Sequence, residues 1–172
     1  MEFSDIYKEN RDVVYNVCLH YLQNVEDAED ASQEIFVLIH DKINQFKGDS
    51  TVKTWVYRIT VNYCLDFLKS KSRAKRWGGL LRVIPGLYSE EEAFREFNHP
   101  GIILEKKEET EQLLRYINEL PAQQKTAIIL TQIEGLTQKE AAEIIEVSIK
   151  AVESLVGRAK TNLKKMYDKA RD

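Results

Sequence analysis

The chain has 172 residues, of which 43% are hydrophobic and 31% charged, and its formal net charge is −3. This length and composition predict a globular protein with one ordinary domain or two small ones, and they exclude a disordered chain. No apolar run approaches the roughly 18 residues that a membrane-spanning helix needs. Since the N-terminus does not resemble a signal peptide either, we expect a cytoplasmic protein.

The charges are distributed unevenly along the chain. Neither Lys nor Arg occurs from residue 12 to residue 41, whereas residues 69–82 hold six bases and no acid. Residues 148–171 hold seven bases against two acids. Two basic segments of this kind can form a local footprint for nucleic acid although the net charge is close to zero.

Helical periodicity dominates the first third of the chain, and strand signals are almost absent. A first helix is predicted near the N-terminus, and Asn24 can cap a second helix that runs to about Phe46. The expected inner faces are Phe3, Ile6, Tyr7, Val14, Val17, Cys18, Tyr21 and Leu22 in the first helix, and Ala28, Ala31, Ile35, Leu38, Ile39 and Ile43 in the second. Cys18 and Cys64 lie in apolar helical patterns, which favours buried free thiols over a disulfide.

A turn-rich loop follows, and then a third helix from about Val52 to Ser70. This helix is apolar around most of its girth, but one polar line interrupts it at Arg58, Asn62, Asp66 and Lys69. The line is either a surface stripe held by local pairs such as Asn62 with Asp66, or a polar seam beside aromatic side chains that receives an unstacked base.

The composition changes at about residue 72, because residues 72–101 hold four of the seven glycines and two of the three prolines. We interpret this segment as a linker between two helical halves. In the second half, one helix is expected from near Ile102 to Leu120, and Pro121 suits the first position of the next, which Gly135 ends. Thr137 with Glu140 forms a capping box that opens a short helix to about Ile145. Ser148 then caps a long final helix.

Residues 136–160 have the spacing of a helix-turn-helix, with the small Ala142 where two helices would cross. The outer face of the final helix is rich in hydrogen-bonding and basic side chains, which suits a helix that enters the major groove. The alternative is an ordinary helical hairpin with a solvated charged face. Glu146 occupies a turn position where glycine is common, so we expect another turn geometry there. Gly157 costs roughly 1 kcal/mol relative to Ala inside a helix, and it either lets the backbone approach DNA closely or is merely tolerated.

Three motifs, in this order along the chain, distinguish it from other small helical proteins. They are DAEDASQEIF at residues 27–36, FKGDSTVKTWVYRITVN at residues 46–62, and the helix-turn-helix within residues 119–165. The chain resembles, over nearly its whole length, an extracytoplasmic-function (group IV) sigma factor of bacterial RNA polymerase. The resemblance implies an all-α fold of two small domains, with a sigma-2 domain at residues 1–72, a linker at 73–101 and a sigma-4 domain at 102–172.

The resemblance also implies three binding surfaces. The acidic helix would bind the clamp helices of the polymerase β′ subunit through Asp27, Asp30, Gln33 and Glu34, whose spacing of three and four places them on one face opposite Ala31 and Ile35. The minus-10 element of the promoter would be bound by Lys47, Gly48, Asp49, Ser50, Lys53, Thr54, Tyr57, Asn62, Lys69, Lys71 and Arg73. Within this set, Asn62 is expected beside the pocket for a flipped base, and the last three residues on phosphates.

The minus-35 element would be bound in the major groove by Ser148, Lys150, Glu153, Ser154, Arg158 and Lys160. Many relatives carry a base where this chain has Glu153. A carboxylate can accept a hydrogen bond from cytosine N4, or it can pair with Arg158 or Lys150 and position them.

The implied function is non-catalytic: the protein joins core polymerase, recognises both promoter elements and promotes melting of the duplex. Expected partners are the β′ clamp helices, the β flap, promoter DNA and an anti-sigma factor, which can hold such proteins at the inner membrane. No cofactor, metal or small-molecule substrate is expected. One alternative is a helix-turn-helix regulator that binds duplex DNA without joining core polymerase. An enzyme is disfavoured because His20, His40 and His99 are scattered and no cluster has metal-ligand spacing.

Overall fold

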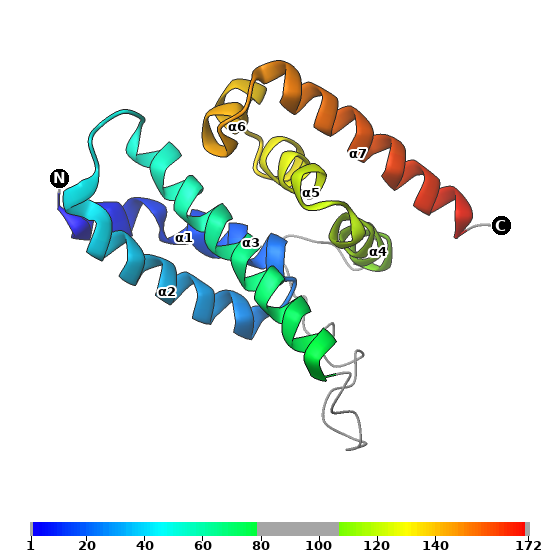
Figure 1. The fold of residues 1–172 in the computed structure, drawn as a ribbon, viewed down its shortest axis with the longest axis horizontal. Helices are drawn as coiled ribbons and strands as arrows, with labels where there is room; N and C mark the ends of the chain where they lie inside the picture. Colours follow the sequence, from blue (N-terminus) through cyan, green and yellow to red (C-terminus); the bar gives the residue numbers. More distant parts are fainter. Residues whose placement is uncertain (1, 79–106, 171–172) are drawn as a thin grey trace. The chain divides into compact units, whose positions relative to one another are not determined.

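The computed structural model of the chain describes residues 2–78 and 107–170, and these residues form helices joined by short turns (Figure 1). They divide into two compact units. The first comprises Met1–Asp49 with Ile59–Phe97, and the second comprises Ser50–Arg58 with Asn98–Asp172. Helix α3 therefore contributes its beginning to the second unit and its remainder to the first.

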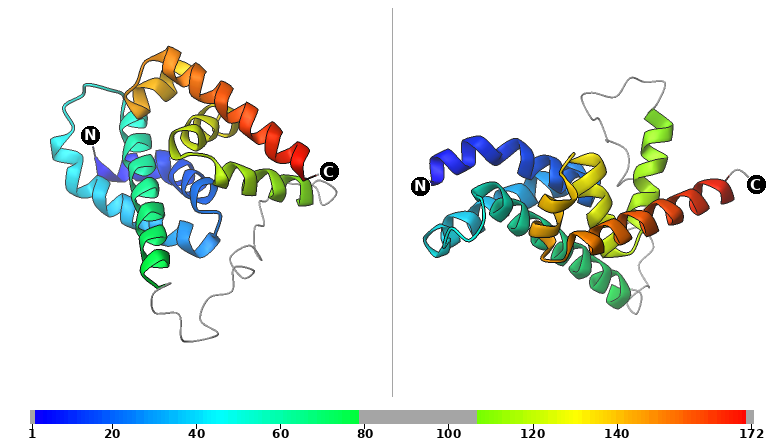
Figure 2. Two further views of the ribbon diagram at one scale, coloured as in Figure 1. Left: turned by 45° about the vertical axis from the view of Figure 1, so that its right-hand side comes forward. Right: turned by 90° about the horizontal axis from the view of Figure 1, so that it is seen from above.

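The first unit is built on an antiparallel pair, α1 (Phe3–Leu22) and α2 (Val25–Lys42), which lie side by side in both figures (Figures 1 and 2). The 3-10 turn η1 (Ile43–Gln45) extends α2, close to the predicted end. Asn24 caps α2 as predicted, since its side chain accepts from the Asp27 N–H at 2.8 Å. Most of the predicted inner faces are buried, but Tyr7 is 43% exposed and that part of the prediction is wrong.

Helix α3 (Val52–Gly78) is the third helix that contributes to the core of the first unit. Cys64 of α3 and Cys18 of α1 are both buried free thiols, as predicted, with their sulfur atoms 3.8 Å apart. The hydrogen bond from Cys64, together with burial, raises the pKa of the Cys18 thiol.

Helix α3 ends later than the predicted Ser70, because the basic segment that follows contains neither Gly nor Pro before Gly78 and so continues the helix. The first residues of the predicted linker are therefore helical. The rest of that linker, from residue 79, and the predicted helix start at Ile102 lie outside the described residues.

The second unit contains α4 (Lys107–Glu119), α5 (Ala122–Ile128) with its π-helical extension η5 (Ile129–Ile133), α6 (Gln138–Ile145) and α7 (Ile149–Lys169). Helices α5 and α6 pack on α7, and the core is centred on fully buried residues, among them Ala127, Ile129, Leu130, Ala141, Val152 and Ala159. Pro121 precedes α5 as its cap rather than occupying its first position, because its ψ of 141° is extended.

The predicted helix ends of this unit are largely confirmed. Gly135, with φ of 68°, follows η5, and the Thr137–Glu140 capping box opens α6. Glu146 corrects one expectation: its φ of 57° is the left-handed geometry that glycine would supply. The Val147 N–H closes that turn on the Ala142 carbonyl at 3.1 Å, which is a Schellman-type bond. The strain of the non-glycine residue is thus offset by a satisfied helix end.

None of the helices in the described ranges is both long and apolar enough to span a membrane.

Candidate protein- and nucleic-acid-binding surfaces

The acidic residues of α2 form one face, as their spacing predicted. Asp30, Gln33 and Glu34 are exposed. Ala31 and Ile35, on the opposite side of the helix, are 1% and 0% exposed. We call Asp27, Asp30, Gln33 and Glu34 the acidic face.

Asp27 differs from the other members of the acidic face because it already has a cationic partner. Its Oδ2 atom lies 2.8 Å from Nζ of Lys71 in α3, and only 28% of its side chain is exposed. Lys71 was predicted to contact DNA phosphates, so two residues assigned to different partners neutralise each other here. The sequence gives no sign of this pair, because 44 positions separate the two residues.

Tyr63 of α3 lies within the electrostatic reach of the acidic face. Burial, and next the negative charge of Glu34, raise the pKa of its hydroxyl, with a smaller contribution from Asp30.

An open groove adjoins the acidic face between α1 and α2, with a volume of about 730 Å³. It is lined by Phe3, Tyr7, Arg11, Asp12, Tyr15, Ser32, Gln33, Phe36, Val37 and His40. The rings of Tyr7 and Phe36 meet edge to face with centroids 4.8 Å apart. Gln33 belongs to both surfaces, so a partner that covers the acidic face would also reach the groove. The sequence did not reveal this groove, because the helical spacing of Tyr7 predicted a buried side chain.

The residues predicted for the minus-10 element fall into two groups. In the first unit, the loop residues Lys47, Gly48 and Asp49 are exposed, and Gly48 has the left-handed φ of 80° that glycine permits. Along the first-unit part of α3, the exposed members are Asn62, Lys69, Lys71 and Arg73. The local pair on the polar line is Asp66 with Lys69, at 3.1 Å, rather than the suggested pair of Asn62 with Asp66.

The other group, Ser50, Lys53, Thr54 and Tyr57, belongs to the second unit. Thr54 and Tyr57 are only 6% and 3% exposed, so neither side chain is free in this conformation. The Thr54 hydroxyl lies 2.9 Å from that of Thr51, which also caps α3 by accepting from the Thr54 N–H.

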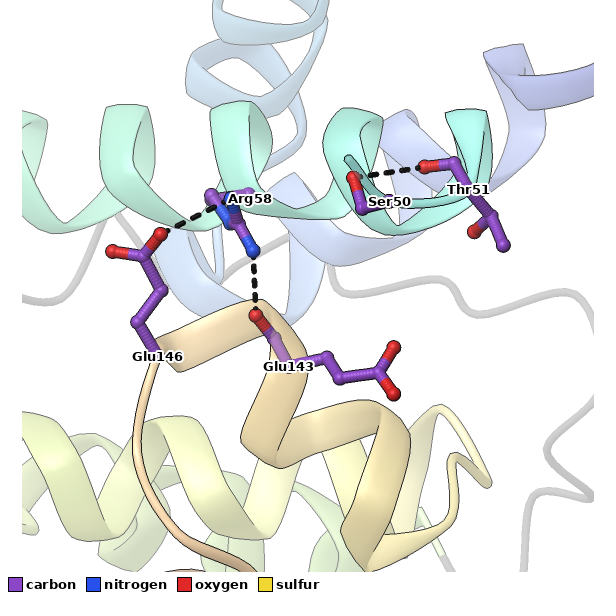
Figure 3. A network of polar contacts seen from close by, with 5 residues as sticks. All are labelled: Ser50, Thr51, Arg58, Glu143 and Glu146. Carbon is purple, nitrogen blue, oxygen red and sulfur yellow. Dashed lines mark hydrogen bonds and ion pairs between the residues drawn. The ribbon is translucent and has the colours of Figure 1, made fainter. Parts of the chain in front are cut away.

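Tyr57 and Arg58 link the beginning of α3 to the helix-turn-helix region. The Tyr57 hydroxyl donates to a Glu134 carboxylate oxygen at 3.3 Å, and burial followed by the Glu134 charge raises its pKa. The Arg58 guanidinium lies 3.1 Å from the Glu146 carboxylate and donates to the Glu143 carbonyl at 2.7 Å (Figure 3). Figure 3 also shows that the Glu143 carboxylate points away from Arg58.

The outer face of α7 presents the residues predicted for the minus-35 element. Ser148 caps the helix, since its hydroxyl accepts from the Ala151 N–H at 3.1 Å. The other predicted residues are exposed: Lys150, Glu153, Ser154, Arg158 and Lys160. Arg158 donates to the Ser154 carbonyl at 3.3 Å, and no ion pair joins it to Glu153 in the described part of the chain.

Comparison with known proteins gives the family. The family model "Sigma-70 region 2" matches residues 6–74, and "Sigma-70, region 4" matches residues 110–163. The ECF RNA polymerase sigma factor SigW of Bacillus subtilis (strain 168) is 27% identical over 163 residues, which are 95% of this chain and 87% of SigW. The chain belongs to the extracytoplasmic-function (ECF) group of the sigma-70 family. Members of this family are transcription initiation factors.

A second ECF relative, the sigma-E factor of Escherichia coli (strain K12), is 28% identical over 134 residues. These residues are 78% of this chain and 70% of the sigma-E factor. Two solved structures share the fold. The sigma factor RpoE of Bartonella quintana, solved with the anti-sigma factor NepR, has a TM-score of 0.68 at 20% identity and 96% coverage of both chains. CnrH, solved with the cytosolic domain of CnrY, has a TM-score of 0.64 at 21% identity, covering 96% of this chain and 87% of CnrH.

The two family matches fit the order of the ECF elements. Region 2 covers the acidic face, most of the groove and most of α3, and region 4 covers the helix-turn-helix. Residues Ser50–Arg58 lie in the region 2 match yet cluster with the second unit. The sequence motif alone could not show this, because it carries no information on packing partners.

Proposed function

We propose that the chain directs core RNA polymerase to promoters by binding the polymerase through the acidic face and promoter DNA through α3 and α7. The observation that carries this proposal is the pair of region 2 and region 4 matches in one chain, joined to a one-sided acidic helix. A helix-turn-helix regulator would account for region 4 but leaves region 2 without a role. We assign no catalytic step to the chain, since the polymerase supplies the chemistry.

The acidic face is suited to a basic protein surface rather than to DNA, because its carboxylates would repel phosphates. We assign it to the β′ clamp helices, with Asp30, Gln33 and Glu34 as the freely exposed members. The adjacent groove adds aromatic area, the kind of surface that anchors protein interfaces. The β flap is a further expected contact of the second unit.

Promoter reading is divided between two surfaces. The exposed side chains of α7 would read the minus-35 element in the major groove, and those of the loop and α3 would hold unpaired minus-10 bases and phosphates. Two modest readers in one chain bind more tightly than either alone, because the second contact becomes intramolecular.

An anti-sigma factor is the expected inhibitor. RpoE and CnrH were both solved in complexes, RpoE with an anti-sigma factor. By analogy of fold, we propose that this chain has such a partner too, and that it acts in the cytoplasm or is held at the inner membrane by that partner.

Run-off transcription with cognate core polymerase on genomic fragments tests the proposal. The wild-type chain should produce transcripts from specific start sites, and the Asp30→Arg, Glu34→Arg variant should lose core binding while it keeps its helical circular dichroism. Glu9→Arg with Glu29→Arg is the matched control, since both residues are exposed, lie in the same unit and change the charge equally. If the Asp30→Arg, Glu34→Arg variant still binds core polymerase, the clamp-helix assignment is contradicted.

A chain that binds duplex DNA but neither binds core polymerase nor yields transcripts would instead be a regulator.

A further inference from the structure

The beginning of α3 and the end of α6 meet in the second unit through a contact that the proposed function does not use. We propose that Arg58, with Glu143 and Glu146, forms an autoinhibitory latch that holds the minus-10-binding start of α3 against the helix-turn-helix in the free protein. This inference rests on the proposed role of Ser50, Lys53, Thr54 and Tyr57 in binding the minus-10 element.

The latch has a physical basis in the end of α6. The last carbonyls of a helix lack intrahelical partners and carry partial negative charge, so a cation is favoured there. The Arg58 guanidinium is this cation, and it makes two contacts. It donates to the Glu143 carbonyl at 2.7 Å and pairs with the Glu146 carboxylate at 3.1 Å (Figure 3). Glu146 is also the residue that takes the left-handed turn, which places its side chain at this helix end.

The contact is accompanied by a second one that occupies a side chain the minus-10 element would need. Tyr57 is 3% exposed, and its hydroxyl is bonded to Glu134. Thr54, on the same stretch, is 6% exposed, and its hydroxyl contacts that of Thr51 at the start of α3. An unstacked base therefore cannot reach the Tyr57 ring while the latch is closed, and DNA competes with the contact.

The latch is weak enough to open. The side chains of Arg58 and Glu146 are 31% and 69% exposed, and ion pairs in contact with water are weak and screened by salt. The buried Arg58 Nε has no acceptor among the described residues, which disfavours the closed state further. The apparent DNA affinity of the free chain is then its intrinsic affinity multiplied by the fraction of molecules in which the latch is open.

Glu146→Gln and Glu143→Gln form a matched pair for testing the latch. Both remove one negative charge near the end of α6, and neither alters backbone preferences much. Only the first removes a carboxylate that contacts Arg58, since Arg58 contacts the backbone of Glu143 and not its carboxylate. Any general effect of charge on DNA binding is therefore shared between the two variants.

The probe is a short fluorescein-labelled single-stranded oligodeoxythymidylate, titrated by anisotropy with the full chain at fixed salt and without polymerase. Glu146→Gln should bind about two- to fivefold more tightly than Glu143→Gln, as the strength of a partly exposed ion pair implies. Equal affinities of the two variants would overturn the latch.

A second measurement follows the contact itself. Replacing Trp77 by Phe leaves Trp55, in the first turns of α3, as the single tryptophan of the two in the chain. Acrylamide quenching of Trp55 should increase in Glu146→Gln and not in Glu143→Gln. Unchanged quenching would overturn the latch even if DNA affinity rose.

These results are separable from the proposed function. If the wild type supports run-off transcription and the two variants behave alike in both assays, the latch is wrong and the function stands. If the wild type supports no transcription, the function is wrong, whatever the quenching shows.

Discussion

Replacing Gly157 by Ala tests what this glycine does in the middle of α7. The residue is exposed on the outer face, between the predicted DNA contacts Ser154 and Arg158. A Cβ atom added there meets nothing within 4 Å, and the backbone is helical. The fold itself therefore gives no reason for a glycine at this position.

The magnitude follows from helix propensity alone. Without a clash, Gly157→Ala should stabilise the second unit by about 1 kcal/mol, the difference between the two residues in a helix interior. For a unit of this size that corresponds to a rise in Tm of roughly 4–8 °C. If α7 enters the major groove with Gly157 against the DNA, the same methyl group should weaken binding, so stability and affinity change in opposite directions.

Differential scanning calorimetry of the full chain and anisotropy with a duplex that carries the minus-35 element, identified from run-off start sites, measure the two effects. Thr161→Ala is the control, because it also raises helix propensity at an exposed position of α7 but adds no atom at residue 157. A variant with no gain in stability would refute the reasoning about the open space around Gly157. Unchanged DNA affinity alongside a gain in stability would show that the glycine is merely tolerated.

Three further changes test single residues. Arg158→Ala should weaken binding to the minus-35 duplex by about 1–3 kcal/mol if its guanidinium contacts a base; no loss at matched salt would argue against that contact. Asn62→Ala should impair promoter opening, followed by permanganate reactivity, more than core binding; normal opening would make Asn62 a structural residue. Glu140→Gln should flatten the stability profile in acid. The hydrogen bonds from Thr137 lower the folded pKa of Glu140 below its ordinary value. The stability that Glu140 contributes is therefore present above that ordinary value and is lost as pH falls through the folded pKa. Identical urea midpoints of variant and wild type across that acid range would contradict this account.

The features predicted best from the sequence are local ones. Asn24, Thr137 with Glu140, and Ser148 cap the helices that their sequence spacing predicted. A cap forms between residues three positions apart, so a few neighbouring letters contain all the partners involved. The acidic face of α2 was predictable for the same reason, because helical periodicity fixes which residues share a side.

The errors of the sequence analysis arise where local patterns were incomplete. Tyr7 fits the apolar spacing of α1, yet it is 43% exposed because it lines the groove beside Phe36. Glu146 adopts the left-handed backbone geometry that the prediction allowed only to glycine. Its strain is offset by the satisfied end of α6 and by its ion pair with Arg58. The site assignments themselves remain predictions, because they depend on partners that the chain binds.

The sequence by itself determined the helical fold, the order of its elements and the family, since periodicity, capping residues and motif order are all properties of neighbouring positions. Only the tertiary structure decided that Lys71 meets Asp27 and that Tyr57 and Arg58 meet Glu134 and Glu146. These partners are separated by long stretches of chain, and an exposed or half-exposed charge accepts many partners of opposite sign. Which of them it meets is set by how helices pack, through the buried residues beneath, and not by the charged residues themselves.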